Sequence, residues 1–176
     1  MQRNVEIKAR LSNIESTLDL VKSIADTGPE VLVQEDTFFQ SSKGRLKLRR
    51  FGESDGELIY YERPDSEAPA ECKYLRIPTA EPDKIVDVLG RSNGVLGVVR
   101  KKRSVYIVGQ TRVHFDDVER LGQFLELEVV LRPGQSASEG VGIAEDLIER
   151  LGISTNDLID HAYIDMLHGT QKPHKE

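Results

Sequence analysis

The sequence predicts an α+β protein built on a closed antiparallel β-barrel of eight strands, a tunnel with helices on its flanks. Two observations support this prediction. Several segments alternate charged and aliphatic residues, so that one face of an extended strand is fully charged and the other fully apolar. The clearest are Val5–Lys8, Arg45–Arg49 and Phe124–Glu128. About eight strand-like runs occur along the chain, a number that closes a small barrel with the charged faces turned inward.

The N-terminal part is expected to contain a strand and then a helix. Residues 3–11 alternate as a strand does. Ser12 then resembles a helix N-cap, and Glu15 three residues later would complete a capping box before apolar residues at helical spacing. Gly28-Pro29 is expected to end this helix, because glycine favours the C-terminal cap and proline cannot continue a helix.

Consecutive strands and a second helix are expected in the middle of the chain. Short runs rich in Gly, Ser and Asp separate the first three of these strands as turns. The expected strands span residues 31–40, 45–52, 57–63 and 72–78. Pro82 suits the first position of a helix, and Asn93-Gly94 suits its end.

A hairpin and one further strand are expected next. Residues 95–108 and 111–116 flank Gly109-Gln110, which is typical of a tight hairpin turn. A strand over residues 123–131 follows and carries the alternation of glutamate and leucine.

A long helix and a short one complete the prediction. Ser136 and Glu139 repeat the capping-box spacing before apolar residues at helical spacing. Gly152 is expected to end the long helix, and a short helical stretch is expected over residues 155–167.

The composition is typical of a globular protein without a membrane anchor. Of its 176 residues, 31% are charged and 38% are hydrophobic, so we expect one domain over residues 1–168 and a polar tail over 169–176. The net charge of −6 argues against nucleic acid and anionic membranes as partners. A single cysteine, Cys72, and the lack of a signal region or a long apolar run favour a cytoplasmic location.

The residues predicted to face the lumen form a basic set and an acidic set. The basic set consists of Lys8, Lys47, Arg49, Arg63, Lys101 and Arg103. The acidic set consists of Glu6, Glu126 and Glu128, with Asp116 nearby in the sequence. Guanidinium groups suit phosphate oxygens and lysines add point charge, whereas carboxylates are hard ligands that suit Mg²⁺ or Mn²⁺. Such a lumen would fit a polyanion and its metal ions.

Alternating charged strands are also typical of solvated faces that carry only weak ion pairs. The leucines between the charges favour the lumen instead, because they would lie under the helices and leave the charged residues on the concave side. These leucines are Leu46, Leu48, Leu125 and Leu127. Cations crowded into a concavity cost about several kcal/mol each unless they are paired or bind a ligand. His114 is expected to be a structural histidine, and a metal-binding role for Asp116 stays open.

Short motifs along the chain add a resemblance to a known family. Asn4-Val5-Glu6-Ile7-Lys8 matches a Glu-x-Glu-x-Lys signature at its second Glu and its Lys. Other similar segments are Gln34–Phe39, Leu46–Arg49, Tyr61–Arg63, Val99–Arg103, His114–Glu128 and Tyr163–Leu167. In this order and spacing the chain resembles the CYTH superfamily of triphosphate tunnel metalloenzymes. That family includes class IV adenylyl cyclases, thiamine triphosphatases, inorganic triphosphatases and fungal-type RNA triphosphatases.

The resemblance implies a tunnel whose basic residues hold a triphosphate and whose acidic residues hold Mg²⁺ or Mn²⁺. It implies that the metal ligands are Glu6, Glu126, Glu128 and Asp116. It implies that the substrate-binding residues are Lys8, Lys47, Arg49, Arg63, Lys101 and Arg103, and that Glu6, Lys8 and Glu128 are catalytic. Two positions depart from the family pattern: Asn4 replaces its first Glu, and Arg63 replaces a Lys. An amide is a poorer cation ligand than a carboxylate, so weaker metal binding is expected.

The main functional hypothesis is a metal-dependent phosphohydrolase in which water attacks a terminal phosphorus. Its substrate would be a triphosphate-containing small molecule, such as inorganic triphosphate or a nucleoside or thiamine triphosphate. One alternative is a class IV-type adenylyl cyclase, in which the ribose 3′-hydroxyl attacks the α-phosphorus and pyrophosphate leaves. No adenine-reading motif supports it. Another alternative, favoured by Asn4, is a non-catalytic binder of polyphosphate or nucleotide. An oligomer is compatible with each of these functions.

Overall fold

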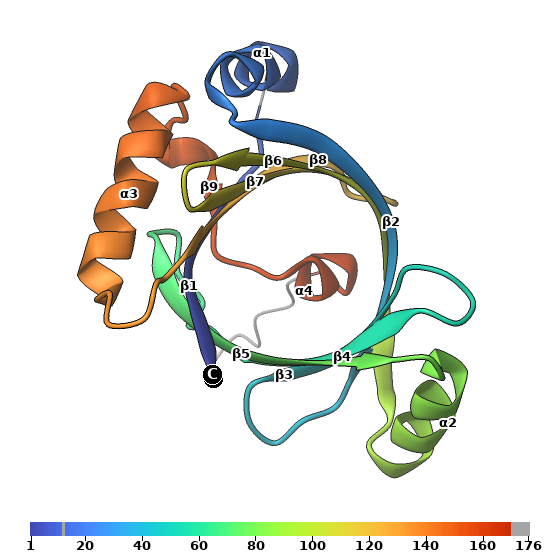
Figure 1. Ribbon diagram of the computed structural model, residues 1–176. Coiled ribbons are helices and arrows are strands. Elements are labelled where there is room, and N and C mark those ends of the chain that lie inside the picture. Colours follow the sequence, from blue (N-terminus) through green and yellow to red (C-terminus); the bar gives the residue numbers. More distant parts are fainter. Residues whose placement is uncertain (12, 170–176) are drawn as a thin grey trace, which may run out of the picture.

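The computed structural model describes residues 1–11 and 13–169, and within them eight antiparallel strands close into a barrel (Figure 1). The strands are β1 (Gln2–Ala9), β2 (Thr27–Phe39), β3 (Arg45–Arg50), β4 (Gly56–Glu62), β5 (Ala70–Thr79), β6 (Val95–Val108), β7 (Thr111–Val118) and β8 (Gly122–Val130). They follow the order β5-β4-β3-β2-β6-β7-β8-β1, and the pairing of β1 with β5 closes the ring. The predicted fold class is confirmed.

The helices occupy two kinds of position relative to the barrel. They are α1 (Ile14–Ile24), α2 (Pro82–Ser92), α3 (Ala137–Arg150) and α4 (Tyr163–Leu167). Figure 1 shows α1, α2 and α3 outside the ring and α4 within its outline. Tyr163 and Ile164 of α4 pack with the inward residues Phe38, Val99 and Phe124. This apolar cluster fills one end of the lumen.

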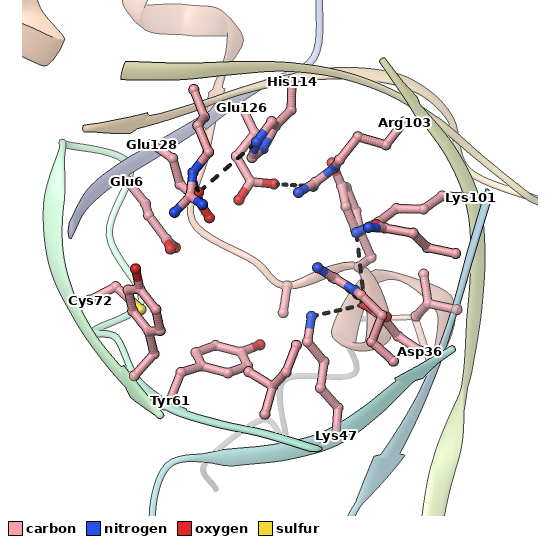
Figure 2. A pocket seen from close by; sticks show the side chains of 18 of the residues that line it. Glu6, Asp36, Lys47, Tyr61, Cys72, Lys101, Arg103, His114, Glu126 and Glu128 are labelled. Carbon is pink, nitrogen blue, oxygen red and sulfur yellow. Dashed lines mark hydrogen bonds and ion pairs between the residues drawn. The ribbon is translucent and has the colours of Figure 1, made fainter. Parts of the chain in front are cut away.

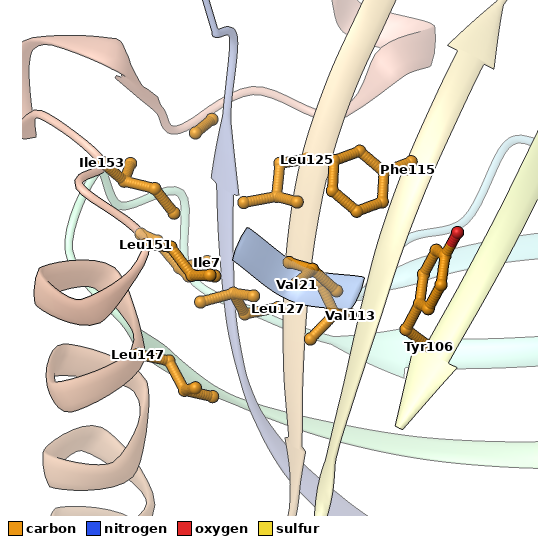
Figure 3. Packing of buried hydrophobic residues seen from close by; sticks show 11 residues of the cluster. Ile7, Val21, Tyr106, Val113, Phe115, Leu125, Leu127, Leu147, Leu151 and Ile153 are labelled. Carbon is orange, nitrogen blue, oxygen red and sulfur yellow. The ribbon is translucent and has the colours of Figure 1, made fainter. Parts of the chain in front are cut away.

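The aliphatic faces of the strands form the main core, as the alternation predicts. Leu125 and Leu127 of β8 pack outward with Leu147 of α3, with Leu151 at the C-cap of that helix and with Val21 of α1 (Figure 3). On the other side of the barrel, Leu48 of β3 is fully buried. Helix α2 contacts this strand. Burial of these faces turns the charged residues of the same strands inward.

The helix α1 begins one residue later than predicted. Its N-cap is Asn13, whose side chain accepts a hydrogen bond of 3.2 Å from the backbone nitrogen of Ser16. The predicted cap, Ser12, lies outside the described residues. Asparagine caps a helix as well as serine does, so the sequence offers an N-cap residue at position 12 and another at position 13.

Gly28-Pro29 lies inside β2 rather than at a helix end, so that prediction is wrong. Helix α1 already ends at Ile24, and β2 begins at Thr27. Gly28 has a φ of 123°, and a Cβ atom there would lie 2.7 Å from the carbonyl oxygen of Val105 on β6. Glycine is therefore needed where β2 approaches β6 closely, and the register of the two strands shifts at this point.

Several local signals are confirmed. Pro82 is the first residue of α2, and both hydrogen bonds of the Ser136–Glu139 capping box are present at α3. Gly109 has a φ of 58° in the turn between β6 and β7, and Gly152 has a φ of 63° just after α3. Each glycine occupies a left-handed conformation that other residues adopt at a cost.

The predicted helical stretch over residues 155–167 is divided in the structure. It contains a 3₁₀ turn (Thr155–Asp157), the short strand β9 (Leu158–Ile159), which pairs with β1, and α4. Of the predicted tail, residues 170–176 lie outside the described residues, so the domain boundary at 168 stays a prediction. In the described part of the chain no helix is long and apolar enough to cross a membrane. The cytoplasmic location stays a prediction.

A leucine-to-alanine exchange tests the packing between the barrel and α3. Leu127 has no exposed surface, so Leu127→Ala should lower the free energy of unfolding by about 2–5 kcal/mol. Leu75→Ala is the matched control, because Leu75 is 48% exposed on β5 and should cost about 0.5 kcal/mol or less. Urea unfolding measures both values. Equal losses in the two variants would contradict the assigned core.

Candidate functional site

A cavity of ≈ 270 Å³ occupies the lumen and is lined by alternate residues of the strands (Figure 2). Strand β1 contributes Asn4, Glu6 and Lys8, and β8 contributes Glu126 and Glu128. The other predicted site residues that line it are Lys47, Arg49, Arg63, Lys101 and Arg103. The structure therefore brings together residues that are up to about 120 positions apart in the chain, as side-chain alternation around a closed barrel requires.

The basic side of the lumen is organised around Asp36 of β2. Its carboxylate accepts hydrogen bonds from Lys47 Nζ at 2.8 Å and from Arg49 Nε and Nη2 at 2.7 and 2.8 Å. Lys101 Nζ lies 3.8 Å from the same carboxylate. Burial opposes ionisation of Asp36, but the Arg49 and Lys47 charges hold its pKa well below the usual range. One buried anion thus positions three cations that face the cavity.

A second carboxylate, Asp116 of β7, positions the neighbouring cations. It accepts two hydrogen bonds of 2.6 Å from Arg103, and Tyr163 Oη donates to it at 2.9 Å. Burial opposes its ionisation, but the Arg103 and Lys101 charges lower its pKa. Asp116 is 1% exposed, and these donors already occupy three of its roughly four lone-pair sites. This geometry favours a role in holding Arg103 rather than the metal-binding role predicted for Asp116.

The acidic side of the lumen lies on β1, β7 and β8. Glu6 is the cross-strand partner of Glu128, and Glu126 stands opposite both Lys8 and His114. Residues directly opposite each other share one face of the sheet, so these side chains meet inside the barrel. His114, Glu126 and Glu128 offer ligand atoms that lie within 4.8 Å of one another. Sequence reasoning placed the two glutamates here but not the histidine.

Arginines partly neutralise this acidic side. Arg103 Nη2 donates to Glu126 at 3.1 Å, and Arg112 Nε lies 2.7 Å from Glu128. Arg63 Nε lies 3.5 Å from Glu6. Burial opposes ionisation of Glu126, but the Arg103 and Lys8 charges lower its pKa. Each of the carboxylates of Glu6, Glu126 and Glu128 therefore faces at least one cation, yet these three carboxylates remain close to one another.

Burial and neighbouring charges shift the pKa values of several groups in the lumen. Burial, together with the charges of Glu128 and Glu126, raises the pKa of Glu6 to about 7. On the basic side, burial and the Arg103 charge lower the pKa of Lys101 to about 7. Burial lowers the pKa of His114 to about 4, so its imidazole is neutral at pH 7. A bound polyanion would therefore reduce the repulsion among the cations on the basic side, and a bound cation would reduce the repulsion among the carboxylates on the acidic side.

The donor set on the acidic side fits a divalent cation. Carboxylate oxygens are preferred ligands of Mg²⁺ and Mn²⁺, and neutral imidazole also binds metal. Asn4 is 1% exposed, and its Nδ2 donates to Glu6 Oε1 at 2.9 Å. Among the described residues, Asn4 Oδ1 and His114 Nδ1 are buried without a hydrogen-bond partner. The orphaned oxygen of Asn4, beside clustered carboxylates, is an acceptor that a bound cation would satisfy.

Sequence reasoning missed three further residues of the lumen. Asp36 was not among the predicted lumen residues, although it alternates with Gln34 and Phe38 on β2 as an inward residue should. Arg112 alternates with His114 on β7 and could have been found in the same way. Tyr163 reaches the lumen from α4, and its ring lies 3.9 Å from Lys8 Nζ and 5.3 Å from Lys101 Nζ. No periodicity in the sequence indicates that contact.

Replacing Asp36 tests whether its charge organises the basic side. At pH 7, Asp36→Asn should lower the free energy of unfolding by about 3–5 kcal/mol, because three buried cations lose their shared partner. A carboxyl with a depressed pKa contributes stability above its unfolded pKa of 3.8, and this contribution is lost as the pH falls below that value. The difference between parent and variant should therefore shrink in urea unfolding at about pH 3.

Asp87→Asn is the control for this experiment. Asp87 pairs with Arg91 on the surface of α2 and is 64% exposed, so its loss should cost about 1 kcal/mol or less. A deficit in Asp36→Asn that stays the same at both pH values would contradict the ionised, charge-pairing role of Asp36.

Comparisons with known proteins agree with this geometry. Residues 2–163 match the CYTH domain. Adenylate cyclase CyaB of Aeromonas hydrophila is 28% identical over 172 residues, which cover 90% of this chain and 85% of that protein. The solved structure of the PH1012 protein from Pyrococcus horikoshii OT3 is similar with a TM-score of 0.82 and 26% identity, over 92% of this chain and 98% of that one.

The same fold occurs in a Hippeastrum protein that was assigned as an adenylyl cyclase and shows a dominant triphosphatase activity. Its TM-score is 0.64 at 15% identity, and the match covers 98% of both chains. The family match extends over the whole barrel, from the first residue of β1 to beyond β8. The chain therefore belongs to the CYTH domain family.

Proposed function

We propose that this chain is a metal-dependent phosphohydrolase that acts on a triphosphate-containing small molecule held in the lumen. The observation that carries the proposal is the division of one enclosed cavity into a basic side and an acidic side (Figure 2). Basic side chains outnumber acidic ones among the residues that line it. Internal pairing therefore leaves positive charge for an anionic ligand, and the family match supports a phosphorylated one.

The basic side chains would bind the phosphates. Lys47, Arg49 and Lys101 converge on Asp36, and Arg103 is fixed by Asp116, so their donors are already in position before a ligand arrives. Preorganised donors stabilise developing charge without reorganisation during the reaction. Lys8 and Arg63 lie toward the acidic side and would contact the phosphate nearest the metal.

The acidic side would hold the metal. Glu6, Glu126 and Glu128 are the carboxylates that we assign to it. A bound Mg²⁺ or Mn²⁺ would neutralise phosphate charge and activate water. The water oxygen would form a bond to the terminal phosphorus as the bridging P–O bond breaks. The diphosphate part of the substrate is the leaving group, orthophosphate is the product, and the proton lost by the water passes to the bridging oxygen that leaves. Glu6 and Glu128 would position the water, and Lys8 would stabilise charge on the phosphate oxygens.

Two alternatives share this lumen. The similarity to adenylate cyclase CyaB favours a cyclase, which needs the same phosphate-binding side chains. The Hippeastrum protein supports hydrolysis, since its fold hosts a dominant triphosphatase activity. Asn4 favours a third function, binding without turnover, because a neutral amide stands beside the carboxylates. Hydrolysis is preferred because the sequence shows no adenine-reading motif, which a cyclase acting on ATP would need.

Product analysis on three proteins tests the proposal. Parent, Asn4→Glu and Glu128→Gln are incubated with inorganic triphosphate, ATP or thiamine triphosphate and increasing Mg²⁺ or Mn²⁺. Phosphate, pyrophosphate and cyclic AMP are measured separately. We expect slow phosphate release by the parent and steeper metal dependence in Asn4→Glu, because it adds a ligand charge. We expect about a hundredfold loss or more in Glu128→Gln, because a metal ligand is lost.

Each of the other outcomes has a distinct meaning. Cyclic AMP and pyrophosphate from ATP would establish the cyclase. Phosphate release by Asn4→Glu but not by the parent would show that this chain binds triphosphates without processing them. Equal rates in the parent and Glu128→Gln would contradict the assigned metal site.

A binding measurement tests the basic side without turnover. Triphosphate with Mg²⁺ should raise the melting temperature of the parent, because a ligand that binds only the folded state stabilises it. Lys47→Gln should reduce this shift strongly and stay folded, because Arg49 still pairs with Asp36 through two hydrogen bonds. Lys43→Gln is the control, since Lys43 is 78% exposed outside the lumen. A full shift in Lys47→Gln would exclude Lys47 from the phosphate site.

A further inference from the structure

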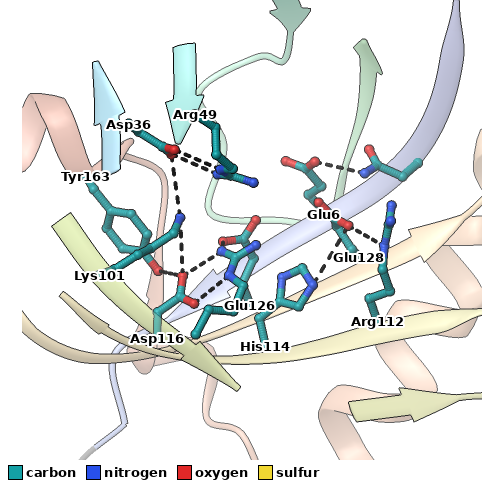
Figure 4. A network of polar contacts seen from close by, with 12 residues as sticks. Glu6, Asp36, Arg49, Lys101, Arg112, His114, Asp116, Glu126, Glu128 and Tyr163 are labelled. Carbon is teal, nitrogen blue, oxygen red and sulfur yellow. Dashed lines mark hydrogen bonds and ion pairs between the residues drawn. The ribbon is translucent and has the colours of Figure 1, made fainter. Parts of the chain in front are cut away.

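His114 occupies an unusual position for a structural histidine. It is 3% exposed and lines the lumen between the carboxylates of Glu126 and Glu128 (Figure 4). Within residues 1–11 and 13–169, its Nδ1 atom is buried and has no hydrogen-bond partner. A buried polar atom left unpaired costs about 1–3 kcal/mol, so a purely structural histidine would be expected to find a partner.

The other ring nitrogen also lacks a hydrogen bond to its nearest carboxylate. His114 Nε2 lies 4.0 Å from Glu128 Oε2, which is too long for a hydrogen bond of about 2.7–3.2 Å. Two ligand atoms that each lie about 2.1 Å from one cation can be up to about 4.2 Å apart. The observed spacing is too long for direct contact and lies within the limit for two ligands of one ion, with Nε2 as the coordinating nitrogen and Nδ1 carrying the ring proton.

We propose that His114 is a ligand of the divalent cation together with Glu126 and Glu128, and that its imidazole makes this site select Mn²⁺ over Mg²⁺. The inference rests on the metal-dependent part of the proposed function. Mg²⁺ strongly prefers oxygen ligands, whereas imidazole suits first-row transition metals. Asn4 acts in the same direction, because an amide in place of a carboxylate lowers the negative charge offered to a hard cation.

The arginines on the acidic side are compatible with this assignment. Arg103 contacts Glu126 through Oε2, and Arg112 contacts Glu128 through Oε2. A carboxylate has two oxygens and several lone pairs, so each glutamate can pair with an arginine and still coordinate a cation. Register supports the arrangement too, since His114 is the direct cross-strand partner of Glu126.

The test measures metal binding to the full chain without any triphosphate. Mn²⁺ affinity is measured by loss of the free-ion electron paramagnetic resonance signal, and Mg²⁺ affinity by calorimetry. The spin-echo spectrum of bound Mn²⁺ reports whether a nitrogen atom is coordinated. The proteins are the parent, His114→Gln and the control His161→Gln, whose imidazole pairs with Asp160 and does not line the lumen.

We expect the parent to bind Mn²⁺ at least about tenfold more tightly than Mg²⁺, with nitrogen coupling in the spectrum. His114→Gln should lose the nitrogen coupling and about tenfold or more of its Mn²⁺ affinity, while its Mg²⁺ affinity changes by less than about threefold. His161→Gln should match the parent. If His114→Gln does not fold, His114→Asn replaces it.

The nitrogen coupling of the parent decides the question independently of any variant. Mn²⁺ bound without nitrogen coupling, or coupling that persists in the His114 variant, would overturn the inference while leaving the metal-dependent function standing. Equal losses of Mn²⁺ and Mg²⁺ affinity would refute the claim of selectivity. A parent that binds neither ion would overturn the metal role of the whole acidic side, and turnover of inorganic triphosphate would then be measured separately.

Discussion

Asp36 and Asp116 share a physical role, since each is a fully buried carboxylate that holds lysines and arginines inside a closed barrel. Without them, the cations of β3 and β6 would repel one another in a low-dielectric lumen. With them, Arg49 and Arg103 are held by two hydrogen bonds each, and their orientation is fixed. The remaining positive charge faces the cavity. The same pairing therefore makes the lumen compatible with folding and prepares it for an anion.

The two sides of the lumen are complementary because of strand order. The cations that Asp36 and Asp116 hold come from β3 and β6 on one side of the ring, and the acidic cluster comes from β1, β7 and β8 on the other. A linear polyanion placed between them would contact cations along its length and meet the carboxylates at one point. In the proposed function, that arrangement would bring a metal and a phosphate together in one place, which is the requirement of metal-assisted phosphoryl transfer.

The helix α4 links the apolar end of the lumen to its charged part. Tyr163 packs on Phe124 with ring centroids 5.0 Å apart, and its hydroxyl donates to Asp116. Its ring also lies against the ammonium groups of Lys8 and Lys101. Cation–π contact of this kind strengthens when water is excluded. The C-terminal part of the chain thus helps to position cations that lie far from it in the sequence.

The sequence by itself determined the barrel and most of its lining, because alternation with period two assigns each strand residue to one face once the aliphatic face is buried. Lys47, Arg49, Glu126 and Glu128 were identified in this way. Only the tertiary structure decided which charges meet. The cross-strand register pairs Asp36 with Arg49 and places His114 opposite Glu126, and the path of α4 brings Tyr163 to Lys8. These contacts depend on strand order and chain path, which residue periodicity does not contain.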